Sequence, residues 1–380
     1  MAAARQAGGR LKTVRRLLYK DIVSSVGFVT LAFLSLFFFI DFVDELDNVG
    51  SLGRGAWQAA LAALFDVPGH LYELLPIAVL IGTIYSLSRM AQSSEYTILR
   101  TGGLGPGRAL SLLAVLGVFF GGLTFVVGDF LAPASERQAV RLKAQFSGGM
   151  KVGGAGAWLK ERRSAPDGEH GVSVNVAGIG ASGLLEGIRI FEFDADGRLT
   201  SRIAAREGRV DSAGIWQLTD TEVIRWPSVR ESEAPAVSTT RTATLAWPST
   251  LSASVVAAAV LPVATMTAAE LWRYSQHLSG QEQAAQRHQI TFWKKAFYPL
   301  ACLVMMALAL PFAYLRARSG GVSLKVFGGI MLGISFLLLN NLAGHVGLLR
   351  DWTPWIVAAT PSLIYLMISL AAFAWLVRYR

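Results

Sequence analysis

Six long apolar stretches constrain this chain more than any other feature of its sequence. Crossing the hydrocarbon core of a membrane takes about 20 mostly apolar residues in a helix, because each residue rises about 1.5 Å. The stretches run over 22–40, 74–88, 109–128, 296–315, 326–349 and 352–377, and an apolar segment at 57–65 extends the second backwards. With 53% hydrophobic and 16% charged residues, the composition is outside the soluble class. The sequence therefore predicts six transmembrane helices.

The net charge of +9 at first favours a nucleic-acid partner. The lysines and arginines, however, gather beside the apolar stretches, where the inner surface of a membrane accounts for them. The first twenty residues contain neither the apolar core nor the cleavage site of a signal peptide, so the first apolar stretch is expected to remain as a helix. Cys302 is the single cysteine and forms no internal disulfide. We expect a membrane partner and no nucleic acid.

Cations in short loops predict the orientation, because they are retained on the cytoplasmic side. They lie at 10–20, 89–108, 316–325 and 378–380, which six crossings place on one side of the membrane. The opposite short connections are acidic or mixed, as at 44–47 and 350–351. Both termini are therefore expected in the cytoplasm of a bacterium. The long region after the third stretch is then expected in the periplasm, outside the inner membrane.

This long region has the pattern of short strands. Polar and apolar residues alternate at 173–179 and 187–193, and further strand-like segments follow turns at 194–197 and 211–214. Such a series predicts a sandwich or an open barrel. From 267 to 293 the period becomes helical, which predicts a polar helical hairpin. We expect four parts: the N-terminus with three spans at 1–132, a β domain at 133–265, a helical linker at 266–295 and three spans at 296–380.

No pattern typical of catalysis, of a bound cofactor or of a metal site is present in the sequence. The glycine-rich segment at 102–109 lacks the Lys-Ser/Thr pair of a phosphate-binding loop, and Pro106 removes an amide donor. The five histidines show no ligand spacing. A proton relay needs titratable groups near mid-membrane, but the acidic residues and His345 fall near the outer ends of the spans. We expect no catalytic residue, no metal and no directly bound cofactor.

One short cytoplasmic segment, at 92–100, is a candidate for docking to a partner. Ser93 or Ser94 can cap a helix that carries Glu95 in its first turn, and Tyr96 and Leu99 follow on it. The alternative interpretation is a solvated connector. The pattern alone favours neither.

Taken together, these features resemble the LptF/LptG family, the paired permease subunits of the lipopolysaccharide exporter, and the LptG branch more than the LptF branch. The resemblance covers nearly the whole chain. It is carried by FVDEL at 42–46, LP at 75–76, SE at 94–95, RTG at 100–102, GAW at 156–158, WK at 293–294, Pro299, LPF at 310–312, the segment 341–347, PW at 354–355 and PS at 361–362. The order of these pieces across six helices identifies the family better than any single one.

The resemblance implies a permease that forms a heterodimer with an LptF-like subunit, with ATP used by an LptB-type ATPase dimer bound on the cytoplasmic side. It also implies a β-jellyroll that passes lipopolysaccharide to an LptC-like partner and a periplasmic bridge. Glu95, Tyr96, Leu99 and Arg100 would form the ATPase-coupling segment. The sequence departs from the family at the outer end of the first helix, where Asp41, Asp47 and Asn48 stand in place of basic residues that meet lipid phosphates.

The first and fifth helices are expected to border a lipid cavity. Its candidate residues are Phe38, Phe39, Asp41, Phe336 and Asn341, and ordinary packing explains the apolar ones equally well. The predicted function is that of a non-catalytic permease subunit of an ATP-driven lipopolysaccharide exporter. Two alternatives stay open, an ion-driven lipid flippase and a membrane-anchored periplasmic receptor.

Overall fold

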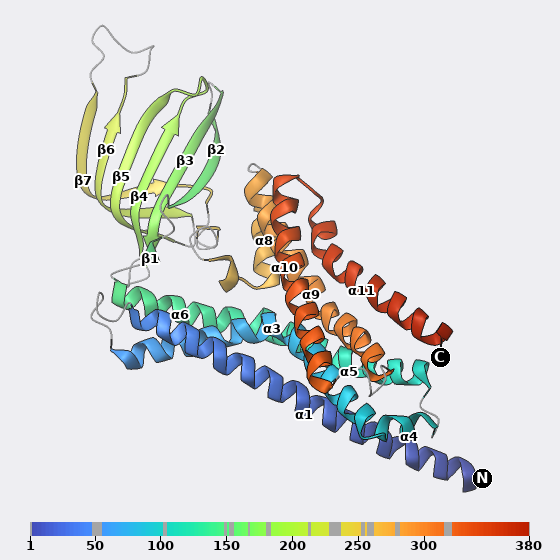
Figure 1. Cartoon of the computed structure of the whole chain (residues 1–380). Coiled ribbons are helices and arrows are strands. Elements are labelled where there is room, and N and C mark those ends of the chain that lie inside the picture. Colours follow the sequence, from blue (N-terminus) through green and yellow to red (C-terminus); the bar gives the residue numbers. More distant parts are fainter. Residues whose placement is uncertain are drawn as a thin grey trace.

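The computed structural model describes residues 2–47, 55–101, 105–147, 150–151, 156–165, 168–179, 184–211, 214–227, 237–251, 255–256, 262–277, 282–314 and 321–379. Six helices among them are long and apolar enough to cross a membrane, which confirms the predicted number. Figure 1 shows a β domain at one end of the helical part, with α4 and the N-terminus at the opposite end.

The helices before the β domain are longer than the predicted spans. They are α1 (Ala2–Asp47), α3 (Ala56–Gln92), α4 (Glu95–Thr101), α5 (Pro106–Val126), a π-helical turn η1 (Val127–Leu131) and α6 (Ala132–Ser147). The segment at 57–65 and the second span form one helix, in which Pro68 is accommodated. Because α6 continues the third span as a helix, the β domain begins later than the predicted boundary at 133.

The helices after the β domain also differ from the prediction. They are α8 (Ala268–His277), α9 (Glu282–Tyr314), α10 (Val322–Leu349) and α11 (Pro354–Tyr379). The predicted hairpin at 266–295 is formed by α8 and the first turns of α9, which pack on each other through Tyr274 and His288, but it is not separate, because α9 runs from Glu282 directly into the fourth span. The polar first turns of α9 lengthen the helix beyond its apolar part, so the pattern of hydrophobic residues alone did not show the continuity.

The spans differ strongly in how far they are buried. In the most apolar 18-residue window, 83% of α3 is buried but only 6% of α1. Glycines allow the close approaches at the centre: a Cβ on Gly82 would lie 2.6 Å from the Cα of Val26 on α1, and one on Gly333 would lie 2.5 Å from the Ile77 side chain. We infer that α3 is the central helix, while α1 presents large apolar side chains, such as Phe28, outwards.

In the described part of the β domain, seven strands form one antiparallel sheet. They are β1 (Met150–Lys151), β2 (Ala157–Ala165), β3 (Gly168–Ile179), β4 (Leu185–Phe193), β5 (Leu199–Val210), β6 (Ile215–Arg225) and β7 (Ser238–Pro248). Strands β3 to β7 pair in chain order, and β1 and β2 both pair with β3. Most connections are therefore between neighbours in sequence, as in a meander.

The sheet is curved because its buried face changes phase along a line across the middle strands. In β5 the buried positions are Ile203 and Ala205 and then Gly208, and β6 changes phase at the same level. Gly187 on β4 and Asp220 on β6 have positive φ at this line, 63° and 53°. Figure 1 shows the curvature of the sheet. The core of the domain includes the fully buried Trp216. The result is a β-jellyroll-like domain inserted between six membrane helices.

Candidate functional site

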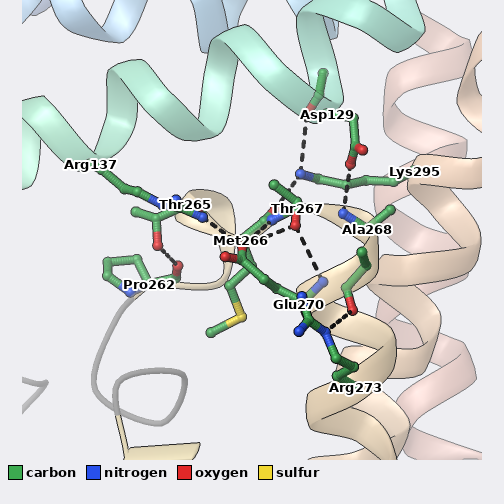
Figure 2. A network of polar contacts seen from close by, with 12 residues as sticks. Asp129, Arg137, Pro262, Thr265, Met266, Thr267, Ala268, Glu270, Arg273 and Lys295 are labelled. Atoms are coloured by element: carbon green, nitrogen blue, oxygen red, sulfur yellow. Dashed lines mark hydrogen bonds and ion pairs between the residues drawn. The ribbon is translucent and has the colours of Figure 1, made fainter. Parts of the chain in front are cut away.

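The segment that leads from the β domain back to the helices is bound by side chains of three different helical elements. Arg137 on α6 donates from Nε to the Thr265 carbonyl at 2.9 Å, and Lys295 on α9 donates from Nζ to the Met266 carbonyl at 2.6 Å. Asp129 on η1 accepts a hydrogen bond from the amide of Ala268 at 2.6 Å. Figure 2 shows these contacts around the segment. We call this set of contacts the junction.

The start of α8 completes the junction. Thr267 precedes the helix, and its Oγ1 accepts a hydrogen bond from the Glu270 amide at 3.3 Å, while Glu270 Oε2 accepts one from the Thr267 amide at 2.8 Å. This reciprocal pair is a capping box. Glu270 also forms an ion pair of 2.5 Å with Arg137. The same carboxylate therefore caps α8 and ties it to α6.

The pKa of Glu270 reflects these contacts. Burial by itself raises the pKa, but the hydrogen bonds from Thr267 and the charges of Arg137 and Arg273 outweigh it and hold the pKa below the usual range of a glutamate. The carboxylate form that makes the junction is therefore the favoured form at neutral pH.

The π-helical turn η1 lies against this junction. A π-helical turn shifts backbone groups out of α-helical register, and Lys295 Nζ donates a second hydrogen bond, of 3.2 Å, to the Gly128 carbonyl within it. A Cβ on Gly128 would lie 2.3 Å from the ring of Tyr72, so only glycine permits this approach of η1 to α3. A small pocket opens here, lined by Tyr72, Phe125, Gly128, Asp129, Ala268 and Lys295.

A second polar cluster joins α1, α3 and α6 near the same end of the helices. Lys143 Nζ lies 2.9 Å from a Glu45 carboxylate oxygen and 3.2 Å from one of Asp66. Asp41, a predicted cavity residue, lies 2.7 Å from Nε2 of His70. Acidic side chains near the end of α1 thus have partners inside the protein. Asn48, the third residue of the departure from the family, lies outside the described residues.

The short helix α4 is held against the helical core by part of its predicted docking residues. Tyr96 is 3% exposed and packs edge-on against the Tyr314 ring at 5.4 Å, and Leu99 packs against the same core cluster. Glu95 is exposed, and Ile98, which the sequence analysis did not single out, is 67% exposed. The Arg100 side chain lies outside the described residues. Tyr96 therefore anchors α4 and does not face outwards with Glu95 and Ile98.

The cavity candidates do not lie together on one surface. Phe336 is 1% exposed and packs edge-on against Tyr365 at 5.2 Å inside the helical core. Phe39 is 63% exposed, Asn341 is exposed, and Phe38 stacks on Phe42 of its own helix at 6.3 Å. Phe336 thus belongs to the packing between helices. The sequence pattern marks this residue as apolar but does not show which side of α10 faces the other helices, so it could not separate packing from the lining of a cavity.

The junction residues Arg137, Asp129 and Lys295 could not be predicted from the sequence. Their partners are mostly backbone groups, which carry no residue-type signal, and they lie far apart in the chain. The one available signal is a charged side chain at each end of an apolar stretch, and its usual explanation is an interfacial anchor. The contacts form only in the folded protein, where the segment that follows the β domain lies against α6, η1 and α9.

Comparison with known proteins agrees with this architecture. Residues 16–377 match the family model of the lipopolysaccharide export system permease LptF/LptG. The LptG permease protein of Escherichia coli strain K12 is 26% identical over 358 residues, which cover 93% of this chain and 96% of the relative. The LptG protein of Haemophilus influenzae strain Rd is 25% identical over 363 residues, 94% of this chain and 97% of the relative. The chain is a multi-pass inner-membrane protein and belongs to the LptF/LptG family of lipopolysaccharide export permeases.

Proposed function

We propose that this chain is a permease subunit that takes lipopolysaccharide from the inner membrane and passes it, through its β domain, to a periplasmic bridge toward the outer membrane. The observation that carries the proposal is the junction. A β domain whose return segment is held by α6, η1 and α9 at once is placed to respond to any movement of these helices (Figure 2). A domain that only hung from the membrane would need no such contacts.

The partners that fit this role are an LptF-like permease in a heterodimer, an LptB-type ATPase dimer that uses the ATP, and an LptC-like protein in the periplasm. The large exposed apolar side chains of α1 suit a second membrane subunit or lipid. For the ATPase, α4 offers exposed Glu95 and Ile98 on a helix anchored through Tyr96. An apolar contact next to a carboxylate is a common composition for the centre of a protein interface.

The orientation that fits the role has α4 in the cytoplasm and the β domain in the periplasm. Its support is the distribution of cations in the short loops. Reporter fusions after Gly103 and Gly320 should read cytoplasmic and one at Asp196 periplasmic. A periplasmic reading at Gly320 would contradict both the orientation and the proposed route.

Reconstitution tests the function itself. The purified chain alone should hydrolyse no ATP, while proteoliposomes with the second permease and the ATPase should hydrolyse ATP and deliver lipopolysaccharide to the periplasmic bridge. Lipid movement by the single chain in response to a proton gradient, without any ATPase, would replace the proposal by the ion-driven flippase. Delivery at the normal rate by a complex that lacks the β domain would show that this domain is no conduit.

The docking role of α4 has its own test. Glu95→Lys should weaken co-purification of the ATPase, because removing one member of a desolvated charge pair costs about 2–5 kcal/mol. Asp196→Lys makes the same charge change at an exposed turn of the β domain and should leave the complex intact. Equal recovery of the ATPase with both variants would remove Glu95 from the interface.

A further inference from the structure

The outer face of the sheet carries aromatic and basic side chains where a free surface normally carries mixed charges. Alternate residues of a strand point to opposite faces, so the neighbours of buried Leu159, Ile190 and Ile203 point away from the core. The register aligns Lys160, Ser173, Phe191 and Arg202 across β2 to β5, and Trp158, Asn175 and Arg189 in the adjacent row. We call Trp158, Lys160, Arg189, Phe191 and Arg202 the outer patch.

The aromatic part of the outer patch is a stacked pair. The Trp158 and Phe191 rings lie 5.9 Å apart with an interplanar angle of 21°, and Trp158 remains 49% exposed. Stacking across strands stabilises a sheet by itself, but it does not require half of an indole to stay in water. A large aromatic side chain that is left open on a rigid sheet is typical of a binding surface.

The basic part of the outer patch lacks internal partners. Among the residues that the structure describes, Lys160, Arg189 and Arg202 have no ion-pair partner, and the buried Nε of Arg202 has no hydrogen-bond acceptor. Elsewhere on this face, two arginines are paired: Arg162 lies 3.7 Å from Glu169, and Arg241 lies 2.8 Å from Glu222. Within the described residues, the positive charge around the aromatic pair is therefore not compensated by an ion pair.

We propose that the outer patch binds the phosphorylated saccharide part of lipopolysaccharide. The proposal rests on the proposed function, which makes this lipid the cargo. Flat C–H faces of sugar rings stack on exposed aromatic rings, and phosphate groups accept charge-assisted hydrogen bonds from guanidinium and ammonium groups. Ser173, between Lys160 and Phe191, adds a hydroxyl group to the same row.

The position of the outer patch on the sheet fits an amphiphile. Trp158 and Lys160 lie on β2, an edge strand that pairs with β3 alone among the described strands, and their neighbours Ala157 and Leu159 point into the apolar core. The first residues of this strand thus present an apolar face inwards and an aromatic, basic face outwards. The outer patch thus lies at an edge of the sheet, directly beside the apolar core of the domain.

The experiment measures binding of the saccharide alone to the full chain in nanodiscs by calorimetry. The probe is the phosphorylated oligosaccharide released from lipopolysaccharide by complete deacylation, and the same oligosaccharide after phosphatase treatment is the comparison. Trp158→Ala and the double variant Arg189→Gln/Arg202→Gln should each weaken binding of the phosphorylated probe about tenfold or more. Phosphatase treatment should weaken binding to the unchanged protein to a similar extent.

Two further variants separate binding from folding. Arg241→Gln lies on the same face outside the outer patch and should bind normally. Trp158→Phe keeps a ring on β2 and should recover part of the affinity that Trp158→Ala loses. Loss of affinity in Arg241→Gln, or no recovery in Trp158→Phe, would mean that the variants act through the sheet and would overturn the assignment.

Two further results of the binding experiment would overturn the proposal that the outer patch binds the saccharide. If the phosphorylated probe does not bind to the unchanged protein, the proposal is overturned. It is also overturned if inorganic polyphosphate binds with equal affinity and Trp158→Ala does not alter that affinity, because the surface then binds anions or acidic proteins in general. ATP-dependent delivery of lipopolysaccharide by the reconstituted complex is a separate measurement. If delivery is normal and the saccharide does not bind, this proposal fails while the proposed function stands.

Discussion

Arg163 in the β domain and Arg137 at the junction each pair with a glutamate, yet the surroundings of the two pairs differ. Arg163 Nε lies 3.0 Å from Glu161, whose side chain is 2% exposed, and its guanidinium lies 4.5 Å from the Trp247 ring centroid. Arg137 pairs with Glu270, whose side chain is 38% exposed. The first pair joins parts of one domain, and the second joins α6 to the start of α8.

The Glu161 side chain is enclosed by its hydrogen-bond partners. Besides Arg163, its carboxylate accepts hydrogen bonds from Ser249 Oγ at 2.6 Å and from the Thr250 amide at 3.1 Å. These contacts tie the edge strand β2 to the segment after β7, the other edge of the sheet. The junction contacts, in contrast, lie between separate elements and remain partly open to solvent. The comparison suggests that the first cluster maintains the shape of the β domain, while the second can open at lower cost and couple the domain to the helices.

The largest expected effect comes from the contacts of Glu161. Glu161→Ala removes the acceptor of three hydrogen bonds, from Arg163 Nε, Ser249 Oγ and the Thr250 amide, at about 1–3 kcal/mol for each donor that stays buried. Hydrogen exchange of the full-length protein should show faster exchange throughout β2 and at 249–251, with the junction amides unchanged. Glu169→Gln, which removes an exposed carboxylate from the neighbouring strand, is the control and should leave exchange unaltered. Equal effects of the two variants would mean that Glu161 does not hold the sheet edges together.

A smaller and more local effect is expected at the junction. Lys295→Met leaves the carbonyl oxygens of Met266 and Gly128 without this donor, at about 1–3 kcal/mol for each group that stays buried. Exchange should accelerate at 263–268, and lipopolysaccharide delivery should fall while the exchange of β2 stays normal. Lys294→Met is a matched control, because the neighbouring lysine donates instead to the Asn340 carbonyl on α10 at 2.7 Å. A control that released the junction to the same extent would contradict the role of Lys295.

Acid distinguishes the two clusters further. Burial raises the pKa of Glu161, but hydrogen bonds from Ser249, Arg163 and Thr250 outweigh it, so the pKa lies below the usual range, as it does for Glu270. A glutamate whose pKa is lower in the folded than in the unfolded state stabilises the fold at pH values above its unfolded pKa of about 4.3. This contribution is lost as the pH falls through the folded pKa. Exchange should therefore rise in acid at both places.

Added salt should affect the acid dependence of the two clusters differently. Because Glu270 is half-exposed, about 0.5 M salt should reduce the acid dependence at the junction, while the buried Glu161 should respond little. Glu161→Gln should remove most of the acid dependence of β2 exchange. An acid response of β2 that persists in this variant, or that salt abolishes, would show that other carboxylates are responsible.

The smallest effect is expected from the cap of α8. Thr267→Ala removes the hydroxyl that accepts a hydrogen bond from the Glu270 amide. We expect the helix to lose about 1 kcal/mol of stability, confined to its first turn. Exchange should rise at 268–271 and nowhere else. Thr291→Ala removes a hydroxyl that bonds within α9 to the Arg287 carbonyl and should not affect α8. If Thr267→Ala loosened the whole junction, the cap and the interdomain contacts would form one cooperative unit.

The sequence by itself determined the number of membrane helices, their order around the inserted domain and the β character of that domain. These properties follow from local patterns, because the length of an apolar stretch and the alternation along a strand are properties of consecutive residues. The family could be identified for the same reason, from short pieces in a fixed order. The exposure of Glu95 on α4 also agreed with its expected position at a helix start.

Only the tertiary structure decided which side of each helix is buried and which charged groups meet. Phe336 and Phe39 read alike as apolar residues of spans, yet one is 1% and the other 63% exposed, because burial depends on the neighbouring helices. In the sequence, Lys294 and Lys295 form a single basic segment before an apolar stretch. In the structure, Lys294 donates a hydrogen bond to α10, whereas Lys295 donates one to the junction. Contacts between a side chain and a distant backbone carbonyl leave no trace in residue type, so they exist only in the folded chain.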